Sequence, residues 1–186
     1  MRIITGRARG ARLKSPKGLS TRPTSDRIKE SLFNILGVRV AGRRVLDLFA
    51  GTGSLGLEAL SRGAVGAVFV DRATEAVLRE NAEHTHLNAA ARIFRDDVFS
   101  SLSRLAAEGA VFDLVFCDPP YHKGLWERTL TVLDASPILS EGALVIVESG
   151  EDEKEVPALS RLSLVREERY GHTTRMRIFE ILEEVG

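Results

Sequence analysis

Short apolar runs alternate with helical patterns along the chain from Arg44 onward. We predict strands where apolar residues cluster between turn residues, and helices where they recur every three or four positions. Such alternation is typical of a parallel sheet with helices on both faces. The predicted strands are 44–49, 66–71, 91–95, 112–117 and 142–149, and the predicted helices are 54–62, 73–87, 98–108 and 124–135.

The end of the chain departs from this alternation. Segments 162–168 and 175–182 are both strand-like, and Tyr170-Gly171-His172 separates them without a helical pattern. Strands joined by a tight turn pair antiparallel, so we expect a hairpin on the sheet edge. Together the patterns predict an α/β fold with a mostly parallel, seven-stranded, Rossmann-like sheet and a C-terminal antiparallel hairpin.

A helix is predicted ahead of the sheet, within residues 22–36. Its N-cap is expected at Thr24 or Ser25. Its polar face is expected to carry Arg27 and Lys29. The apolar face consists of Ile28, Leu32, Ile35 and Leu36.

A β-hairpin is predicted at the N-terminus, because apolar residues flank a turn at 6–10 that is rich in Gly and Arg. We therefore divide the chain into a small N-terminal extension, residues 1–40, and a main domain, residues 41–186. The extension would consist of the hairpin and the first helix.

Composition narrows the class of protein. With 186 residues, 44% hydrophobic and 28% charged, the chain can bury a core, and its apolar runs are too short to span a membrane. Cys117 is the single cysteine, which excludes an internal disulfide and a cysteine-based zinc site. His84 and His86 would point to different faces of a helix, so we expect no metal site. The cysteine usage favours a reducing, cytoplasmic setting.

Positive charge is concentrated at the N-terminal end. Residues 1–44 hold twelve Lys or Arg residues against Asp26 and Glu30, a net charge of +10, whereas the whole chain has a net charge of zero. A basic surface of this kind suits a polyanion such as nucleic acid. The alternative is a solvated, disordered arm.

The segment Val45–Gly56 has the pattern of a nucleotide-binding turn. A buried strand carrying Asp47 is followed by G-x-G-x-x-G, formed by Gly51, Gly53 and Gly56. Glycines at this spacing allow a tight turn, a close approach to a ligand and packing of the next helix on the sheet. NAD and S-adenosylmethionine both fit such a turn, so the turn alone does not choose between them.

Carboxylates recur where the predicted strands end. Asp71 follows Asp47 by 24 residues, close to the interval at which an acid meets ribose hydroxyls. Asp97, with the backbone of Val98, is expected at the adenine edge, and Asp96 is the alternative. Each acid alone could instead cap the next helix.

The segment Asp118-Pro119-Pro120-Tyr121 follows the predicted strand VFDLVFC. Two prolines fix the backbone and remove two N–H donors, which leaves acceptors at the corner. Acceptors can hold the hydrogens of an exocyclic amine, and we assign these contacts to the Asp118 carboxylate and the Pro119 carbonyl. Tyr121 would stack on the base. This corner favours methyl transfer from S-adenosylmethionine, with catalysis mainly by alignment.

These motifs carry a family resemblance. DLFAGTGSLGLEALSRGA, VDR and DPPY, in that order, resemble the class I S-adenosylmethionine-dependent methyltransferases with a D/N-PP-Y/F motif. RPTSDRIKESLFN resembles the opening helix of the RsmD family, bacterial enzymes that methylate guanine N2 in small-subunit (16S) ribosomal RNA. GRARGARLKSP and YGHTTRMRIFE extend the resemblance over nearly the whole chain.

The resemblance implies three groups of site residues. The base would be held by Asp118, Pro119, Pro120 and Tyr121. S-adenosyl-L-methionine, with S-adenosyl-L-homocysteine as its product, would contact Asp47, Ala50, Gly51, Gly53, Asp71, Arg72, Asp97, Val98 and Asp118. RNA would contact Arg7, Arg9, Arg12, Lys14, Lys17, Arg22, Thr24 and Arg27.

The expected function is therefore methylation of the N2 amine of a flipped guanine in 16S ribosomal RNA. The partner would be this RNA, the small ribosomal subunit or an assembly intermediate, without a membrane, and the protein would act as a monomer. Three alternatives remain: an adenine-N6 methyltransferase acting on RNA or DNA, an NAD-dependent oxidoreductase, and a non-enzymatic RNA-binding factor. Guanine is implied by the resemblance alone, because DPPY corners also serve adenine.

Three further features are expected to be structural. The acidic segment 148–155 is expected to be a solvated loop. Trp126 is expected on a core-facing helix, and the border of the base pocket is the alternative position. Arg175 and Arg177 would either extend the RNA surface or flank an edge strand, where charge discourages aggregation.

Overall fold

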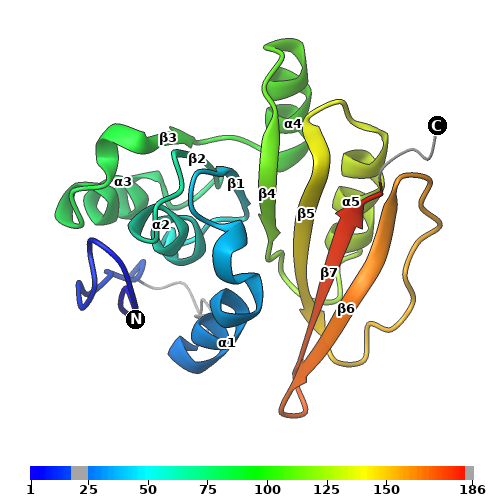
Figure 1. Ribbon diagram of the computed structural model, residues 1–186, viewed down its shortest axis with the longest axis horizontal. Helices are drawn as coiled ribbons and strands as arrows, with labels where there is room; N and C mark the ends of the chain where they lie inside the picture. Colours follow the sequence, from blue (N-terminus) through cyan, green and yellow to red (C-terminus); the bar gives the residue numbers. More distant parts are fainter. Residues whose placement is uncertain (18–24, 183–186) are drawn as a thin grey trace. The chain divides into compact units, whose positions relative to one another are not determined.

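The computed structural model describes residues 1–17 and 25–182, which form two compact units, Met1–Val98 and Phe99–Gly186 (Figure 1). The expected RNA-binding residues Arg22 and Thr24 lie outside the described residues. None of the helices in the described ranges has both the length and the apolar character that a membrane crossing requires.

The first unit is built on three parallel strands, β1 (Arg44–Leu48), β2 (Gly66–Val70) and β3 (Ala91–Phe94), in the order β3-β2-β1. Helix α2 packs on β1 and β2, and α3 packs on β3. The helical elements are α1 (Asp26–Leu36), η1 (Gly37–Arg39), α2 (Ser54–Ser61), α3 (Glu75–His84) and η2 (Asn88–Ala90).

The second unit ends in the predicted hairpin. Strand β5 (Leu139–Gly150) pairs parallel with β4 (Phe112–Cys117) and antiparallel with β7 (Thr174–Ile181), which pairs antiparallel with β6 (Leu162–Tyr170). Figure 1 shows β6 and β7 as the orange and red strands. The helices here are α4 (Val98–Ala107), which begins at the boundary of the units, and α5 (Leu125–Ala135).

The seven strands belong to one mixed sheet, in the order β3-β2-β1-β4-β5-β7-β6. This confirms the predicted α/β fold with a mostly parallel sheet and a C-terminal antiparallel hairpin. Strands β1 and β4 bury successive residues, as parallel strands covered on both faces do. Most of β6, the edge strand, is exposed, and its charged residues suit that position.

Several element boundaries differ from the sequence prediction, two of them by three residues. Helix α3 ends at His84, because His86 adopts a left-handed conformation (φ 58°) that stops the helix. Strand β5 begins at Leu139, because that residue already pairs with Phe112 of β4. The start of α1 at Asp26 agrees with one of the two predicted N-caps, because the Ser25 Oγ accepts a hydrogen bond from the Ile28 N–H at 3.2 Å.

The prediction for the polar face of α1 was wrong at Lys29. Its side chain has no exposed surface. Its ammonium pairs with the buried carboxylate of Glu58 on α2, 3.2 Å away, and this partner makes burial of the charge possible. The buried face of α1 thus consists of Lys29, Leu32, Phe33 and Leu36, whereas Arg27 is exposed as expected.

The predicted N-terminal hairpin is present. Arg2 and Arg12 form an antiparallel bridge, and the Ile3 N–H donates to the Ala11 carbonyl at 2.9 Å. Ile3 and Leu13 are buried, so the apolar residues that predicted the hairpin also attach it to the first unit.

Candidate active site

The glycine-rich segment after β1 forms a tight turn. The Ala50 N–H donates to the Val70 carbonyl (3.0 Å), and the Gly53 N–H donates to the Ala50 carbonyl (2.8 Å). Gly53 (φ 83°) then caps α2 in a left-handed conformation. Phe49 is also left-handed (φ 57°), a strained conformation for a residue other than glycine. Sequence patterns did not reveal this strained residue at the end of β1.

Asp71, which follows β2, ties this turn to the start of α3. Its Oδ2 accepts the Gly51 N–H at 3.0 Å, and its Oδ1 accepts the N–H groups of Ala73 (2.9 Å) and Thr74 (3.2 Å). A carboxylate has about four acceptor positions. Asp71 therefore fits one ribose hydroxyl beside these amides, and a second hydroxyl would have to share or displace one of them.

Gly51 borders open space beside this carboxylate. A Cβ built on Gly51 (φ 57°) would meet no atom within 4 Å among the described residues. In contrast, a Cβ on Gly53 would lie 2.6 Å from Leu78, and one on Gly56 would lie 2.3 Å from Phe69. The first glycine thus borders open space, Gly53 allows close approach of Leu78 of α3, and Gly56 allows α2 to pack on β2, the last as the motif predicted.

Asp47 lies beneath the turn, with 2% of its surface exposed. Its Oδ2 accepts the N–H of Gly56 in α2 at 2.9 Å. Burial raises the pKa of Asp47 to about 8, the Gly56 N–H opposes this rise, and Asp71 adds to it. In this position Asp47 supports the start of α2.

The other residues of the first unit that are expected to bind the cofactor follow strands β2 and β3. Asp96 is exposed, and its Oδ1 accepts the N–H of Asp97 at 2.8 Å. Asp97 is half-buried, Val98 is buried and Arg72 is exposed. The contact between the two acids commits one Asp96 oxygen to the local turn.

In the second unit, the DPPY corner follows β4 as predicted. Asp118 and Tyr121 are half-buried, Pro119 is buried and Pro120 is exposed. The Tyr121 hydroxyl donates to Glu148 Oε1 (2.8 Å) and lies 3.2 Å from the Thr174 Oγ1. Burial, followed by the charge of Glu148, raises the pKa of Tyr121, so its hydroxyl stays protonated. These contacts fix the end of the ring that is expected to stack on the base.

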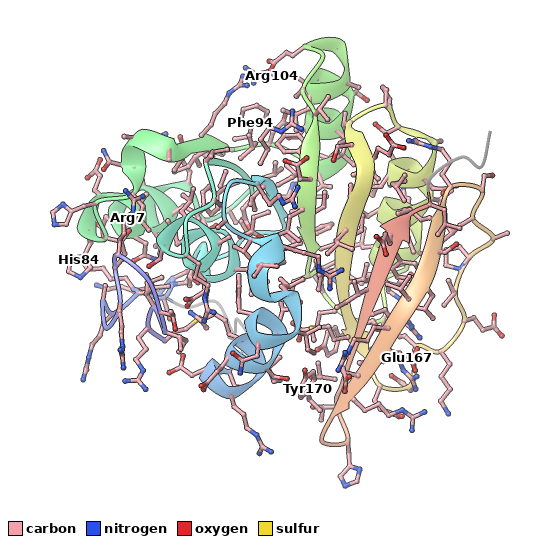
Figure 2. All side chains as sticks on the ribbon, viewed as in Figure 1. Arg7, His84, Phe94, Arg104, Glu167 and Tyr170 are labelled. Atoms are coloured by element: carbon pink, nitrogen blue, oxygen red, sulfur yellow. The ribbon has the colours of Figure 1, made fainter. Side chains whose placement is uncertain are left out.

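The basic hairpin is attached to α2 through the backbone N–H groups of the hairpin. Glu58 accepts the N–H groups of Ile4 (2.8 Å) and Thr5 (3.1 Å), and the Ser61 Oγ accepts the Ala8 N–H (2.9 Å). The arginine side chains are therefore not needed to hold the hairpin, and Figure 2 labels Arg7 on this segment. The expected RNA-binding residues in the described part are all exposed: Arg7, Arg9, Arg12, Lys14, Lys17 and Arg27.

Asn81, on the buried face of α3, links the hairpin to the glycine turn. Its Nδ2 donates to the carbonyls of Lys14 (3.0 Å) and Thr52 (2.9 Å), and its Oδ1 accepts the Lys14 N–H (2.8 Å). Sequence reasoning missed Asn81 as well as Lys29 and Glu58. A polar residue at an apolar position of a helical pattern is the signal that could have revealed them.

Two predictions for the end of the chain were wrong. The segment 148–155 is not merely solvated, because Glu148 and Glu153 bind groups of the second unit. Arg175 and Arg177 are buried in β7, which lies between β5 and β6. Both pair with Glu167, labelled in Figure 2, so they form no RNA surface and flank no edge.

Comparison with known proteins shows the family of this chain. Residues 1–179 match the model of the conserved hypothetical protein 95 family. The ribosomal RNA small subunit methyltransferase D of Escherichia coli strain K12 is 41% identical over 174 residues, which cover 92% of this chain and 85% of that protein.

Solved structures show the same fold. The Escherichia coli protein YhhF superposes with a TM-score of 0.83 at 39% identity, over 98% of each chain. An RNA methyltransferase from Salinibacter ruber, in complex with S-adenosyl-L-homocysteine, superposes with a TM-score of 0.65 at 15% identity, over 88% of this chain and 96% of that one. The protein is a member of the conserved hypothetical protein 95 family, and over 92% of its length it is similar to ribosomal RNA small subunit methyltransferase D.

Proposed function

We propose that this protein methylates the exocyclic N2 amine of a guanine in 16S ribosomal RNA, with S-adenosyl-L-methionine as donor and S-adenosyl-L-homocysteine as product. One observation carries the proposal: each unit has a strand-end loop suited to one half of the reaction. The turn after β1, tied to Asp71, suits the cofactor. The corner after β4, with Tyr121 fixed by Glu148, suits the acceptor base.

The residues of the first unit fit the cofactor. Asp71 would accept a ribose hydroxyl, and the open space at Gly51 admits the ligand to the turn. Asp97 and the backbone of Val98 would meet the adenine edge. Ala50, Gly53 and Arg72 complete the proposed contacts, with Asp47 supporting the turn from below. When bound, the cofactor supplies a methyl group on a positively charged sulfur.

The residues of the second unit would prepare the nucleophile. The N2 lone pair of guanine is delocalised into the ring, so the amine attacks poorly. The Asp118 carboxylate and the Pro119 carbonyl would accept its two hydrogens and direct the lone pair at the methyl group. Tyr121 would hold the ring by stacking. Because in-line attack discharges the sulfonium, the contribution of these residues is mainly alignment.

The exposed basic side chains of the hairpin, Arg7, Arg9, Arg12, Lys14 and Lys17, with Arg27 on α1, would bind RNA phosphates. Arg22 and Thr24 are proposed to contact the RNA as well. Phosphate contacts would supply affinity, and a base splayed from a non-helical element would supply the substrate. We propose that the protein works in the cytoplasm as a monomer, on 16S RNA alone, in the small subunit or in an assembly intermediate.

The Asp118→Ala variant tests the assignment of the corner. We expect methyl transfer to fall at least about 100-fold while RNA binding is retained, because one of the two acceptors that orient the amine is lost. The matched control is Asp113→Ala, which removes a carboxylate at the other end of β4, where it accepts a hydrogen bond from Ser140. Undiminished transfer by Asp118→Ala would refute the assignment.

A further inference from the structure

A loop far along the chain holds the segment that follows the DPPY corner. The Glu153 Oε1 accepts the backbone N–H of His122 at 3.0 Å, and its Oε2 accepts the N–H of Gly150 at 2.6 Å. The His122 Nε2 lies 2.8 Å from the Asp152 Oδ1. The first residue after Tyr121 is therefore held through both its backbone and its ring.

The backbone at His122 needs such support. Its φ of 60° is left-handed, an uncommon and costly conformation for residues other than glycine. His122 is exposed, so core packing does not impose the conformation. The hydrogen bonds of His122 to the carboxylates of Asp152 and Glu153 are contacts that can hold the turn.

The backbone of Glu153 is held by Arg177 of β7. The fully buried guanidinium of Arg177 donates to the carbonyls of Glu153 (2.8 Å) and Lys154 (3.1 Å), and its Nε donates to Glu167 at 3.0 Å. Its Cζ lies 4.7 Å from the centre of the Trp126 ring. The Glu153 carboxylate thus projects from a rigid backbone toward the corner.

We propose that Glu153 is a positioning residue for methyl transfer, which sets the orientation of Tyr121 through the backbone of His122. Tyr121 is then held at two points, its hydroxyl by Glu148 and the peptide that follows it by Glu153. The inference rests on the proposed role of the corner in holding the base.

Steady-state kinetics of the Glu153→Ala variant of the full chain test the proposal. We expect kcat to fall about 10-fold, because small displacements of an aligned group slow the chemical step. KM for RNA and for S-adenosyl-L-methionine should change less than about twofold, because most of the residues proposed to bind RNA phosphates and the cofactor lie in the first unit. The matched control is Glu155→Ala, which removes the same charge from an exposed position in the same loop and should leave kcat unchanged.

A second variant disturbs the same contacts without removing a carboxylate. A Cβ on Gly150 would lie 2.9 Å from the Asp152 Oδ1, 3.0 Å from the Glu153 Oε2 and 3.3 Å from the His122 Nε2. These atoms end flexible side chains that can move aside, so Gly150→Ala should fold. We expect it to lower kcat in the same way, and it decides the question if Glu153→Ala does not fold.

Wild-type kcat in Gly150→Ala and in a folded Glu153→Ala would overturn the proposal. A raised KM for RNA with unchanged kcat would also overturn it, because that result assigns the loop to affinity. Asp118→Ala, assayed in parallel, separates this failure from failure of the proposed function. If Asp118→Ala is inactive and the loop variants are normal, only the role of Glu153 is refuted, whereas an active Asp118→Ala refutes the role of the corner.

Discussion

Lys29 and Glu58 form a buried ion pair in the first unit, with the Lys29 Nζ and the Glu58 Oε1 3.2 Å apart and neither side chain exposed. The Lys29 ammonium also lies 3.1 Å from the hydroxyl of Ser54, the first residue of α2. Burial lowers the pKa of Lys29, and the charge of Glu58 opposes that effect. Since Glu58 also binds the backbone of the hairpin, this pair connects the hairpin, α1 and the helix after the glycine turn.

Replacing Lys29 with Met should destabilise the protein by about 3 kcal/mol, because it leaves the buried Glu58 carboxylate without its ammonium partner. Arg27→Met, on the exposed side of the same helix, should cost less than about 0.5 kcal/mol. Urea denaturation at pH 7 measures both values. A cost below about 1 kcal/mol for Lys29→Met would mean that the pair contributes little to the fold.

The Gly6→Ala variant should detach the hairpin. A Cβ on Gly6 would lie 1.9 Å from the carbonyl oxygen of Ser61 in α2, so the two backbones could not keep their contact. We expect RNA affinity to fall about 10-fold and its dependence on salt to weaken, because phosphate contacts depend on the docked hairpin.

Gly10→Ala is the matched control for that experiment. Gly10 has a similar backbone conformation (φ 85° against 91° for Gly6), but its Cβ would meet no described atom within 4 Å. Titration of RNA at two or more salt concentrations should therefore give nearly wild-type binding for Gly10→Ala. Equal losses of RNA affinity in the two variants would show that RNA binding does not depend on the contact between the hairpin and Ser61.

Asp71→Ala should weaken binding of S-adenosyl-L-methionine by roughly 10- to 100-fold, the range expected when a hydrogen bond to a charged group is lost. The change also removes the anchor of the Gly51 N–H. Asp96→Ala, at an exposed acid after β3, should have a much smaller effect. Isothermal titration calorimetry can compare the two variants. Equal affinities for Asp71→Ala and the wild type would exclude Asp71 from the cofactor site.

Asp47 should make stability depend on pH. Its pKa is about 8 in the folded protein against an ordinary value of 3.8, so between these values the folded state retains a proton that the unfolded state has lost. The contribution of Asp47 to the free energy of unfolding is therefore fully present below about pH 4. It falls as pH rises toward 8, by at most about 1.4 kcal/mol per pH unit.

Asp47→Asn removes this titration while keeping an acceptor oxygen for the Gly56 N–H. Denaturation of the cofactor-free proteins at pH 5 and pH 8 should show the variant gaining stability relative to the wild type as pH rises. If the difference in free energy of unfolding between Asp47→Asn and the wild type is the same at pH 5 and pH 8, the raised pKa of Asp47 is contradicted.

The features that sequence predicted well have short-range causes. The strand carrying Asp47, the glycine turn and the capping of α1 by Ser25 each depend on neighbouring residues, so local patterns suffice. The antiparallel pairing of β6 and β7 also follows from one short turn. The roles of Asp71 and Asp118 in binding remain predictions, although both residues lie at the ends of strands as expected.

The features that sequence missed depend on partners far along the chain. Lys29 looked like a surface residue because Glu58, 29 positions later, cannot be paired with it from periodicity. Glu153 looked like part of a solvated acidic run because its partner is the N–H of His122, a backbone group that carries no sequence signal. Arg177 was misjudged because the position of β7 inside the sheet depends on the strand order.

The most direct test of the proposed function is to identify the methylated nucleoside. The purified protein is incubated with labelled S-adenosyl-L-methionine and small ribosomal subunits from a strain that lacks this activity, and the digested RNA is analysed by mass spectrometry. We predict labelled N2-methylguanosine from 16S RNA, and none with Asp118→Ala. Labelled N6-methyladenosine, or no labelled nucleoside with the wild-type protein, would contradict the account.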